Sequence, residues 1–290
     1  ARQASDAGAD LVLELPRGGK IVAQDTAVER ASGELVAFSD ANALWEPGAL
    51  RELAAAFVDP HVGYACGQVR FVQGAAGAQA TNQEGVYWRY EMALRARESR
   101  LASITAGNGA IYATRRASYI VVDPIMGHDL SFPFNMVKRG WRAVYVPSAR
   151  ATEKMVPSIE GELARKRRMM SHTWPIVLRG GMLSPRGYGL GYALMILSHR
   201  LLRYGTPFLH ALALAANVAL FASGAARLYT VTLALQILLL AAAGLGGVLR
   251  LRVLLIARYY VLTTLSPAAG LWDWLRHGTA ASWEAAEGTR

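Results

Sequence analysis

The stretch Glu34-Leu-Val-Ala-Phe-Ser-Asp40-Ala-Asn42 decides the fold of this chain. A short apolar run bounded by polar residues predicts a buried strand at 35–39, with polar side chains at its carboxyl end. The segments around it alternate in the same way, with strands expected at 11–15, 35–39 and 62–71 and helices at 19–31 and 47–58. Such alternation is typical of a doubly wound α/β sheet.

Folds of this class bind their ligands beyond the carboxyl ends of the strands. We therefore expect the site to include residues 17–20, 39–42 and 106–110. Asp40 and Asn42 place two oxygen donors side by side, a pair that can hold Mg²⁺ or Mn²⁺ while leaving positions for diphosphate oxygens. An Asx turn that leads into the helix at Pro47 explains the same two residues equally well.

A second polar pair, His128-Asp129, precedes a helical stretch that ends near 139–140 and is followed by a strand at 141–147. Asp129 could act as a general base that takes a proton from an attacking hydroxyl. It could instead cap the helix, or stand just before a cap at Ser131. His128 has no second histidine nearby, which favours a polar position at the surface.

A basic run, Arg165-Lys-Arg-Arg168-Met-Met170, forms the third candidate cluster. On a helix, residues 165, 168 and 169 share a face, and a cationic face suits a departing nucleoside diphosphate. Attachment to anionic lipid headgroups explains the run as well, and the two roles are compatible.

The composition points to a membrane. Of 290 residues, 53% are apolar and only 18% charged, yet the net charge is +10. The single cysteine, Cys66, excludes a disulfide within the chain and a multi-cysteine zinc site, and its apolar surroundings predict a buried thiol. The apolar excess lies in the last third, so we expect two domains, 1–180 and 181–290.

Two uncharged segments, at about 204–226 and 228–249, are each long enough to cross a bilayer as a helix. A third span is expected at about 253–272, where Arg258 lies near one end and can snorkel to the headgroups. The segment 187–204 is too short between its charges to span and predicts an interfacial helix.

The arginines predict the topology. Those at 165, 167, 168, 179, 186, 200 and 203 precede the first span, those at 250, 252 and 258 separate the second from the third, and Arg227 alone separates the first from the second. The positive-inside rule then places the amino-terminal domain in the cytoplasm, at the inner (plasma) membrane, with the carboxyl terminus outside. Membrane lipids thus account for the basic charge, and no nucleic-acid partner is expected.

The chain begins at Ala1, in what resembles the tail of a helix, and proceeds directly into the predicted strand at 11–15. A doubly wound sheet normally begins with a strand and a ligand-binding turn. We therefore expect that a first βα unit is missing.

Taken together, the chain resembles the membrane-bound inverting family 2 glycosyltransferases of the GT-A fold, which include the cellulose, chitin, hyaluronan and poly-N-acetylglucosamine synthases. The segments that carry the resemblance are 17–20, 31–42, 87–91, 107–110, 128–129, 165–169, 198–203 and 283–284. The resemblance implies a mixed GT-A sheet followed by interfacial and transmembrane helices.

The resemblance also assigns roles to single residues. Gly19 and Lys20 correspond to nucleotide-contacting residues, with Asp25 where the family usually has Asn. Asp40 and Asn42 correspond to the Asp-x-Asp that binds the metal and the donor diphosphate, with Asn in place of the second Asp. The loop Gly107-Asn108-Gly109 corresponds to an acceptor-binding loop.

Asp129 corresponds to the family's catalytic base, and His128 replaces the acid before it. Arg165 and Arg168 correspond to the Gln and Arg of a Gln-x-x-Arg-Trp signature, while Met169 replaces its Trp. The implied activity is transfer of a sugar from a nucleotide-sugar, a UDP-sugar by expectation, to a polysaccharide or lipid-linked acceptor. The lost Gln and Trp favour short or single additions over processive synthesis. A scaffold subunit or incompetent fragment is the alternative from another class.

Overall fold

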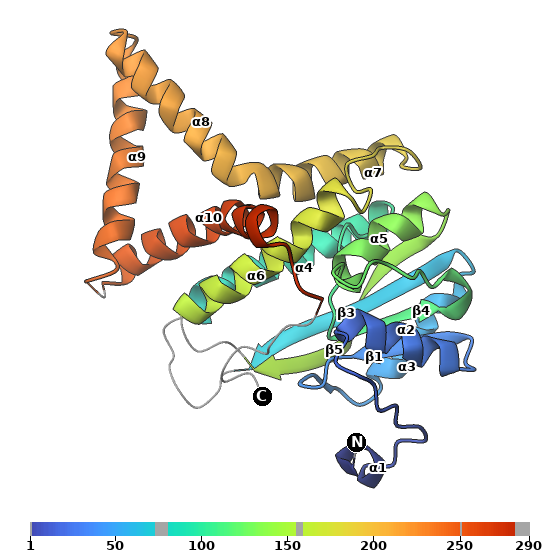
Figure 1. The fold of residues 1–290 in the computed structure, drawn as a ribbon. Helices are drawn as coiled ribbons and strands as arrows, with labels where there is room; N and C mark the ends of the chain where they lie inside the picture. Colours follow the sequence, from blue (N-terminus) through green and yellow to red (C-terminus); the bar gives the residue numbers. More distant parts are fainter. Residues whose placement is uncertain (1, 73–80, 155–158, 250, 282–290) are drawn as a thin grey trace.

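The computed structural model describes residues 2–72, 81–154, 159–249 and 251–281 of the chain (Figure 1). One mixed sheet lies at its centre, in the order β1-β4-β3-β5-β2. β3 and β5 run parallel, and the other neighbouring pairs are antiparallel. The strands are β1 (Leu35–Ser39), β2 (Leu44–Trp45), β3 (Val62–Val72), β4 (Ile111–Arg115) and β5 (Arg142–Lys154). The predicted α/β class and mixed sheet are confirmed.

Helices cover both faces of the sheet. They are α2 (Lys20–Arg30), α3 (Ala49–Ala55), α4 (Thr81–Leu101), α5 (His128–Lys138) and α6 (Ile159–Leu178), with 3₁₀ turns at Ala56–Val58 and Arg116–Ser118. The short helix α1 (Arg2–Asp6) has no buried residue and lies apart from the sheet (Figure 1). Alternate residues of β3 supply the two cores: Tyr64 and Cys66 pack with α4 and α5, whereas Ala65 packs with α3. This alternation follows from the two-residue repeat of a strand. Cys66 is fully buried, as predicted.

The strand expected at 11–15 is wrong. Those residues are irregular, and Leu11 is 60% exposed. β1 is the edge strand on this side, and among the described residues none pairs with its outer edge. A strand without a hydrogen-bonded neighbour has no ladder to hold it extended. The helix expected at 47–58 begins at Ala49, after Gly48 at φ 86°, and tightens into the 3₁₀ turn at 56–58.

The last third of the chain is helical. α7 (Leu190–Met195), a π-helical segment (Ile196–Leu201) and α8 (Leu202–Ala222) form one continuous helix, which is followed by α9 (Arg227–Leu245) and α10 (Arg252–His277). The sequence predicts an interfacial helix at 187–204 separate from the first span, and the structure joins the two without a loop, through the π-helical segment and with Pro207 inside α8. The helix changes direction there (Figure 1). The interfacial position of its amino-terminal part stays a prediction. Helix 190–222, α9 and α10 are each long and apolar enough to cross a membrane.

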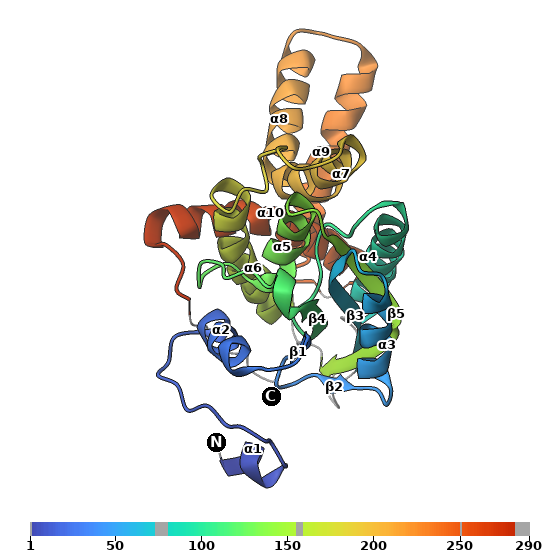
Figure 2. The same cartoon turned by 90° about the vertical axis from the view of Figure 1, so that its right-hand side faces the viewer.

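Figures 1 and 2 show α8 and α9 projecting from the α/β part, while α10 returns to it. A third buried cluster joins the two regions, with Phe134 of α5, Trp174 of α6, Ile196 of the continuous helix and Trp274 of α10. This cluster spans the predicted boundary near residue 180. The amino-terminal part of helix 190–222 therefore packs as part of the α/β body.

Two arginines that the sequence assigns to the membrane surface face the protein instead. Arg200 is 4% exposed and donates to Thr105 Oγ1 at 2.8 Å, and its guanidinium lies 3.4 Å from the Glu91 carboxylate. Arg203 Nη1 donates to the same carboxylate at 2.9 Å. The buried charge of Arg200 is stable only when paired, and Glu91 supplies the pairing. Arg200 therefore does not count among the arginines at the membrane surface, whereas the Arg203 side chain shares the same partner but is 42% exposed.

Candidate functional site

Lys20 is the centre of the candidate site. Its ammonium forms an ion pair with the Asp40 carboxylate and donates a hydrogen bond to Gly109 O at 3.3 Å. Asp40 follows the end of β1, where Ser39 pairs with Ile111 at the start of the antiparallel strand β4. The loop that precedes β4 therefore lies at the same edge of the sheet as Asp40. The structure thus brings together three of the segments predicted from sequence.

The loop 107–109 is built without spare room. A Cβ atom on Gly107 would lie 2.0 Å from Tyr64 Oη, inside the core. Asn108 Nδ2 donates to Gly67 O at 2.7 Å, and its Oδ1 accepts from the amides of Ala110 and Ile111 at 3.1 and 2.9 Å. The Asn108 side chain thus shapes the loop. Contact with an acceptor, which its predicted role requires, would fall to other atoms of this loop.

Asp129 adjoins this loop, because the amide of Gly107 donates to Asp129 O at 2.7 Å. Burial raises the pKa of the Asp129 carboxyl, and the nearby charge of Lys20 opposes that shift. The capping interpretation is wrong: α5 begins at His128, its N-cap is Gly127, and the Ser131 hydroxyl donates to Gly127 O at 2.7 Å. Asp129 is therefore a half-buried carboxyl in the first turn, and the base role stays a prediction.

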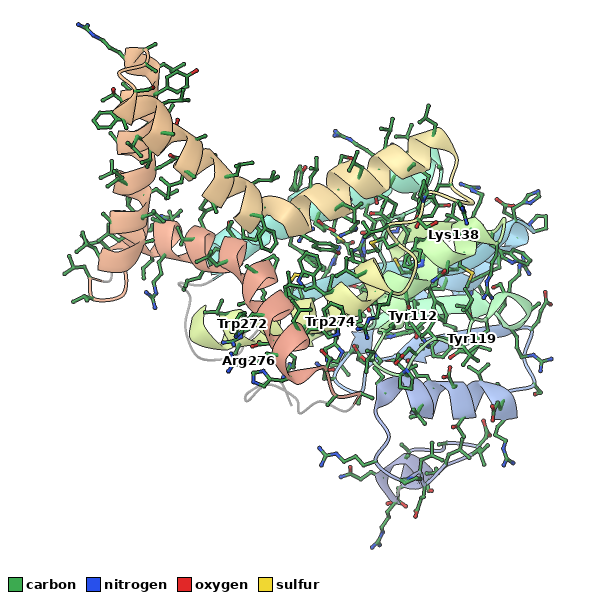
Figure 3. The ribbon with its side chains drawn as sticks, turned by 45° about the horizontal axis from the view of Figure 1, so that its top comes forward. Tyr112, Tyr119, Lys138, Trp272, Trp274 and Arg276 are labelled. Atoms are coloured by element: carbon green, nitrogen blue, oxygen red, sulfur yellow. The ribbon has the colours of Figure 1, made fainter. Side chains whose placement is uncertain are left out.

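The surface position expected for His128 is wrong, since the residue is 3% exposed. Its Nδ1 lies 2.8 Å from the Tyr112 hydroxyl, and its ring stacks on Phe132 at 4.0 Å. Burial, with a smaller contribution from Lys20, lowers the pKa of His128 to about 3. The imidazole is therefore neutral. Tyr112 and Tyr119 lie close together beside it (Figure 3).

The basic side chains of α6 face two different parts of the molecule, the candidate site and α10. Arg165 donates to Met169 Sδ at 3.2 Å, one turn along the helix. Burial and the charge of Asp40 raise the pKa of Glu153 at the end of β5, while Lys20 and Arg165 oppose that shift. Arg165 thus acts on the same electrostatic environment as Lys20 and Asp40. Arg167, by contrast, points to α10.

His172 of α6 is a residue that sequence reasoning missed. Its Nδ1 lies 3.0 Å from Ile125 O, in the loop that leads to Asp129. Burial lowers the pKa of His172, the charge of Arg168 lowers it further, and Asp129 raises it. His172 therefore lies in the fields of both a predicted diphosphate ligand and the predicted base. No spacing in the sequence signals this, because the loop and α6 meet only in the folded chain.

An open hollow of about 420 Å³ lies beside Lys20. It is lined by Leu13, Leu15, Pro16, Arg17, Gly18, Gly19, Lys20 and Ala23. Ligand sites commonly have volumes of roughly 300–1,000 Å³, so this hollow is large enough to accept part of a nucleotide. Gly19 and Lys20 are thereby placed at a possible ligand surface.

The donor atoms at this edge suit a divalent cation held mainly by its substrate. In the part of the chain that the structure describes, no three His, Cys, Asp or Glu side chains gather into a metal cluster. Asp40 and the exposed Asn42 offer hard oxygen atoms two residues apart. Mg²⁺ is usually bound in this manner, through one or two carboxylates with phosphates and water. The residues therefore fit Mg²⁺ or Mn²⁺ bound together with a diphosphate.

Comparisons with known proteins agree with this architecture. The family model described as "Glycosyltransferase like family 2" matches residues 2–171. No curated protein matches the chain significantly. A solved mannosyltransferase from Pyrobaculum calidifontis, in complex with GDP-Man and Mn²⁺, is 20% identical with a TM-score of 0.61, covering 95% of this chain and 73% of the other. At that identity the likeness shows the fold.

Proposed function

The chain belongs to glycosyltransferase family 2, and from that membership we propose that it moves a sugar from a nucleotide-sugar donor to an acceptor hydroxyl, with inversion at the anomeric carbon. The observation that carries the proposal is the meeting of Lys20, Asp40 and Gly109 at one edge of the sheet. Asp129 lies next to them, because its main-chain oxygen accepts a hydrogen bond from the amide of Gly107. A cation, a carboxylate and a second, half-buried carboxyl are the groups that a single displacement requires.

Each group has a role in this scheme. Asp129 accepts the proton of the attacking hydroxyl, and its raised pKa makes it a better base. Lys20 and the predicted ligands Arg165 and Arg168 hold the diphosphate, because cationic donors bind phosphate oxygens strongly. A divalent metal on Asp40 and Asn42 would offset the charge of the leaving diphosphate.

We propose a nucleoside diphosphate hexose as the donor. The sequence favours a UDP-sugar, whereas the structural neighbour was solved with GDP-Man. Both nucleotides therefore belong in the first binding experiment. The acceptor that we propose is lipid-linked or a membrane-associated polysaccharide, because the apolar helices α8 and α9 would hold the site close to a bilayer.

The α/β domain is proposed to face the cytoplasm at the inner membrane. Even without Arg200 and Arg203, Arg186 and Arg252 flank the hairpin of α8 and α9, whereas its far end carries Arg227 alone, as the first residue of α9. This distribution still follows the positive-inside rule.

The test is nucleotide binding and sugar transfer by the wild type and by Asp129→Asn. Calorimetric titration with UDP and with GDP, each with Mn²⁺, should show binding to both proteins. Mass spectrometry of products formed in membranes from a panel of UDP- and GDP-sugars should show that Asp129→Asn loses transfer by about 10²–10⁴-fold. Binding of neither nucleotide by the wild type would favour the scaffold alternative, and full transfer by Asp129→Asn would remove Asp129 as the base.

A further inference from the structure

The carboxyl-terminal half of α10 is docked on α6. Arg167 Nε and Nη2 donate to the two oxygens of Asp273 at 2.5 and 2.6 Å. The Trp174 indole donates to Pro267 O at 2.8 Å in a buried contact. Just beyond α10, the Thr279 hydroxyl donates to Ser171 O at 3.0 Å. These contacts extend from one end of this half-helix to the other.

The two helices also approach closely. A Cβ atom on Gly270 would lie 2.5 Å from Met170 Cβ and 2.8 Å from Ser171 N. The buried residues of α10 in this region are Ser266, Pro267, Gly270 and Trp274, three of which are small. Small residues permit such close packing of helix backbones. The contact is therefore a packed helix pair, and not a touch between side-chain ends.

This docking limits what α10 can span. α6 belongs to the α/β body, since it carries the predicted diphosphate ligands and His172. Residues 266–279 must then lie on the same side of a bilayer as the site. The remaining fourteen residues of α10, 252–265, measure roughly 21 Å as a helix, whereas a hydrocarbon core is about 30 Å thick. The free part of α10 is thus shorter than the hydrocarbon core, and it also carries the charges of Arg252 and Arg258.

α8 is itself docked at its beginning, where Arg203 pairs with Glu91 and Pro207 is buried, so its free residues, 208–222, measure roughly 22 Å. Length therefore does not separate α8 from α10, but charge does, because 208–222 contain no Asp, Glu, Lys or Arg, whereas 252–265 contain Arg252 and Arg258. α9, with 19 residues, measures roughly 28 Å. Asn217 Nδ2 donates to Gln236 Oε1 at 2.8 Å, and the Thr232 hydroxyl donates to Asn217 Oδ1 at 3.1 Å, so polar bonds hold the two helices together. Their outer surface is apolar and exposed, and the hairpin projects away from the sheet (Figures 1 and 2).

We propose that the chain crosses the bilayer twice, through α8 and α9, and that α10 lies along the bilayer surface on the side of the α/β domain. Its partner there is the boundary between lipid headgroups and acyl chains. Trp272 is 57% and Leu275 68% exposed, and the Arg276 guanidinium lies 5.4 Å from the Trp272 ring centre (Figure 3). Exposed tryptophan beside arginine is typical of such a boundary.

This arrangement replaces the expected third span at 253–272 and returns the carboxyl terminus to the side of the site. It rests on the membrane association proposed above, and it does not depend on sugar transfer.

Single-cysteine labelling tests the arrangement. Cys66 is fully buried, so the wild type should give little background with a membrane-impermeant maleimide. The four variants are Val58→Cys on the α/β domain, Ala226→Cys in the α8–α9 turn, Val248→Cys before α10 and Ala280→Cys beyond it. All four positions are exposed. In intact cells the maleimide should label Ala226→Cys alone. In inverted membrane vesicles it should label the other three variants and not Ala226→Cys.

Two results would overturn the proposal, and they differ from each other. Labelling of Ala280→Cys from the side of Ala226→Cys would mean that α10 crosses. Labelling of all four from one side would mean that the hairpin does not cross. The proposed membrane insertion would then be wrong, whereas the proposed sugar transfer would still be decided by the nucleotide-binding and product assays.

A cross-link tests the docking itself. In membranes, the pair Ser171→Cys with Thr279→Cys should form a disulfide on mild oxidation, because the Thr279 hydroxyl lies 3.0 Å from the main-chain oxygen of Ser171. The pair Ser171→Cys with Val248→Cys serves as the control and should stay reduced. Equal cross-linking of both pairs, or of neither, would show that α10 leaves α6 in the bilayer and would overturn the proposal.

Discussion

The imidazole of His199 lies against the carboxylate of Glu98, with 2.6 Å between Nδ1 and Oε1. The other ring nitrogen is 3.2 Å from Glu91 Oε2, so one side chain of helix 190–222 bridges two carboxylates of α4. Glu98 in turn accepts hydrogen bonds from the amide and the hydroxyl of Thr105. Arg200 Nε donates to that same hydroxyl at 2.8 Å. Thr105 is therefore fixed from both helices at once.

Thr105 lies two residues before Gly107, whose amide donates to Asp129 O. The Tyr192 hydroxyl also donates to Ile104 O at 3.0 Å, so helix 190–222 contacts two successive residues ahead of the loop. The apolar helix and the candidate base are thus joined by a short, continuous set of hydrogen bonds. Changes in this buried contact are expected to reach the site through residues 104–107.

Thr105→Val should destabilise the protein by about 1–3 kcal/mol, because it removes the hydroxyl that Arg200 and Glu98 share and leaves buried polar groups unpaired. Thr105→Ser keeps the hydroxyl and is the matched control, expected to lose much less. The measurement is urea unfolding of the detergent-solubilised protein. A Thr105→Val protein as stable as the wild type, or one that loses no more than Thr105→Ser, would show that the hydroxyl is not what fixes this position.

Glu91 predicts an acid-sensitive stability. Burial alone would raise its pKa, but hydrogen bonding to His199 and the charge of Arg200 outweigh burial and hold the pKa at about 2, against a usual 4.5. Because the folded pKa is depressed, the stabilisation is present above about pH 4.5 and is lost as the pH falls towards 2. The shift corresponds to about 3 kcal/mol.

Unfolding free energies measured between pH 6 and 2 should therefore fall steeply in the wild type and less steeply in Glu91→Gln. Glu34→Gln is the control, because the Glu34 side chain is 84% exposed and pairs only at the surface with Arg115. An unchanged slope in Glu91→Gln would show that Glu91 does not carry the acid sensitivity.

Local pattern was enough to predict which segments meet at the candidate site. The run 35–39 is apolar and ends in polar residues, so both the strand and the position of Asp40 follow from it. The glycines at 107 and 109 mark a backbone that packs tightly, and the structure places one against Tyr64 and the other against Lys20. Here local sequence and tertiary packing agree.

The misplaced residues depend on partners that are remote in sequence. Arg200 in an apolar stretch resembles a residue that reaches for headgroups, but its partner Glu91 lies 109 positions earlier. His128 resembles a surface residue until Tyr112 of β4 is brought beside it. The segment 11–15 has the composition of a strand but has no neighbour to pair with. Pairing across the fold, and not local preference, decides these positions.

Lys20→Met should weaken nucleotide binding by about tenfold or more, because a hydrogen bond to a charged group contributes about 1.5–3 kcal/mol. Calorimetric titration with UDP and with GDP in the presence of Mn²⁺ measures the loss. Arg30→Met, at the far end of α2, removes a charge of the same sign and should leave the affinity unchanged. Equal weakening in both variants would point to net charge in place of a specific contact.

Gly107→Ala should cost more stability than any other single methyl in the candidate site, because its Cβ would lie 2.0 Å from the Tyr64 hydroxyl, which is fully buried. Overpacking of this kind typically costs about 1–3 kcal/mol. Gly191→Ala, in α7 with nothing within 4 Å of the new atom, is the matched control. It should stabilise the protein by roughly 0.5–1 kcal/mol, because alanine favours a helix over glycine. Thermal unfolding of both variants gives the comparison, and a Gly107→Ala protein as stable as the wild type would mean that the 107–109 loop can move away from Tyr64.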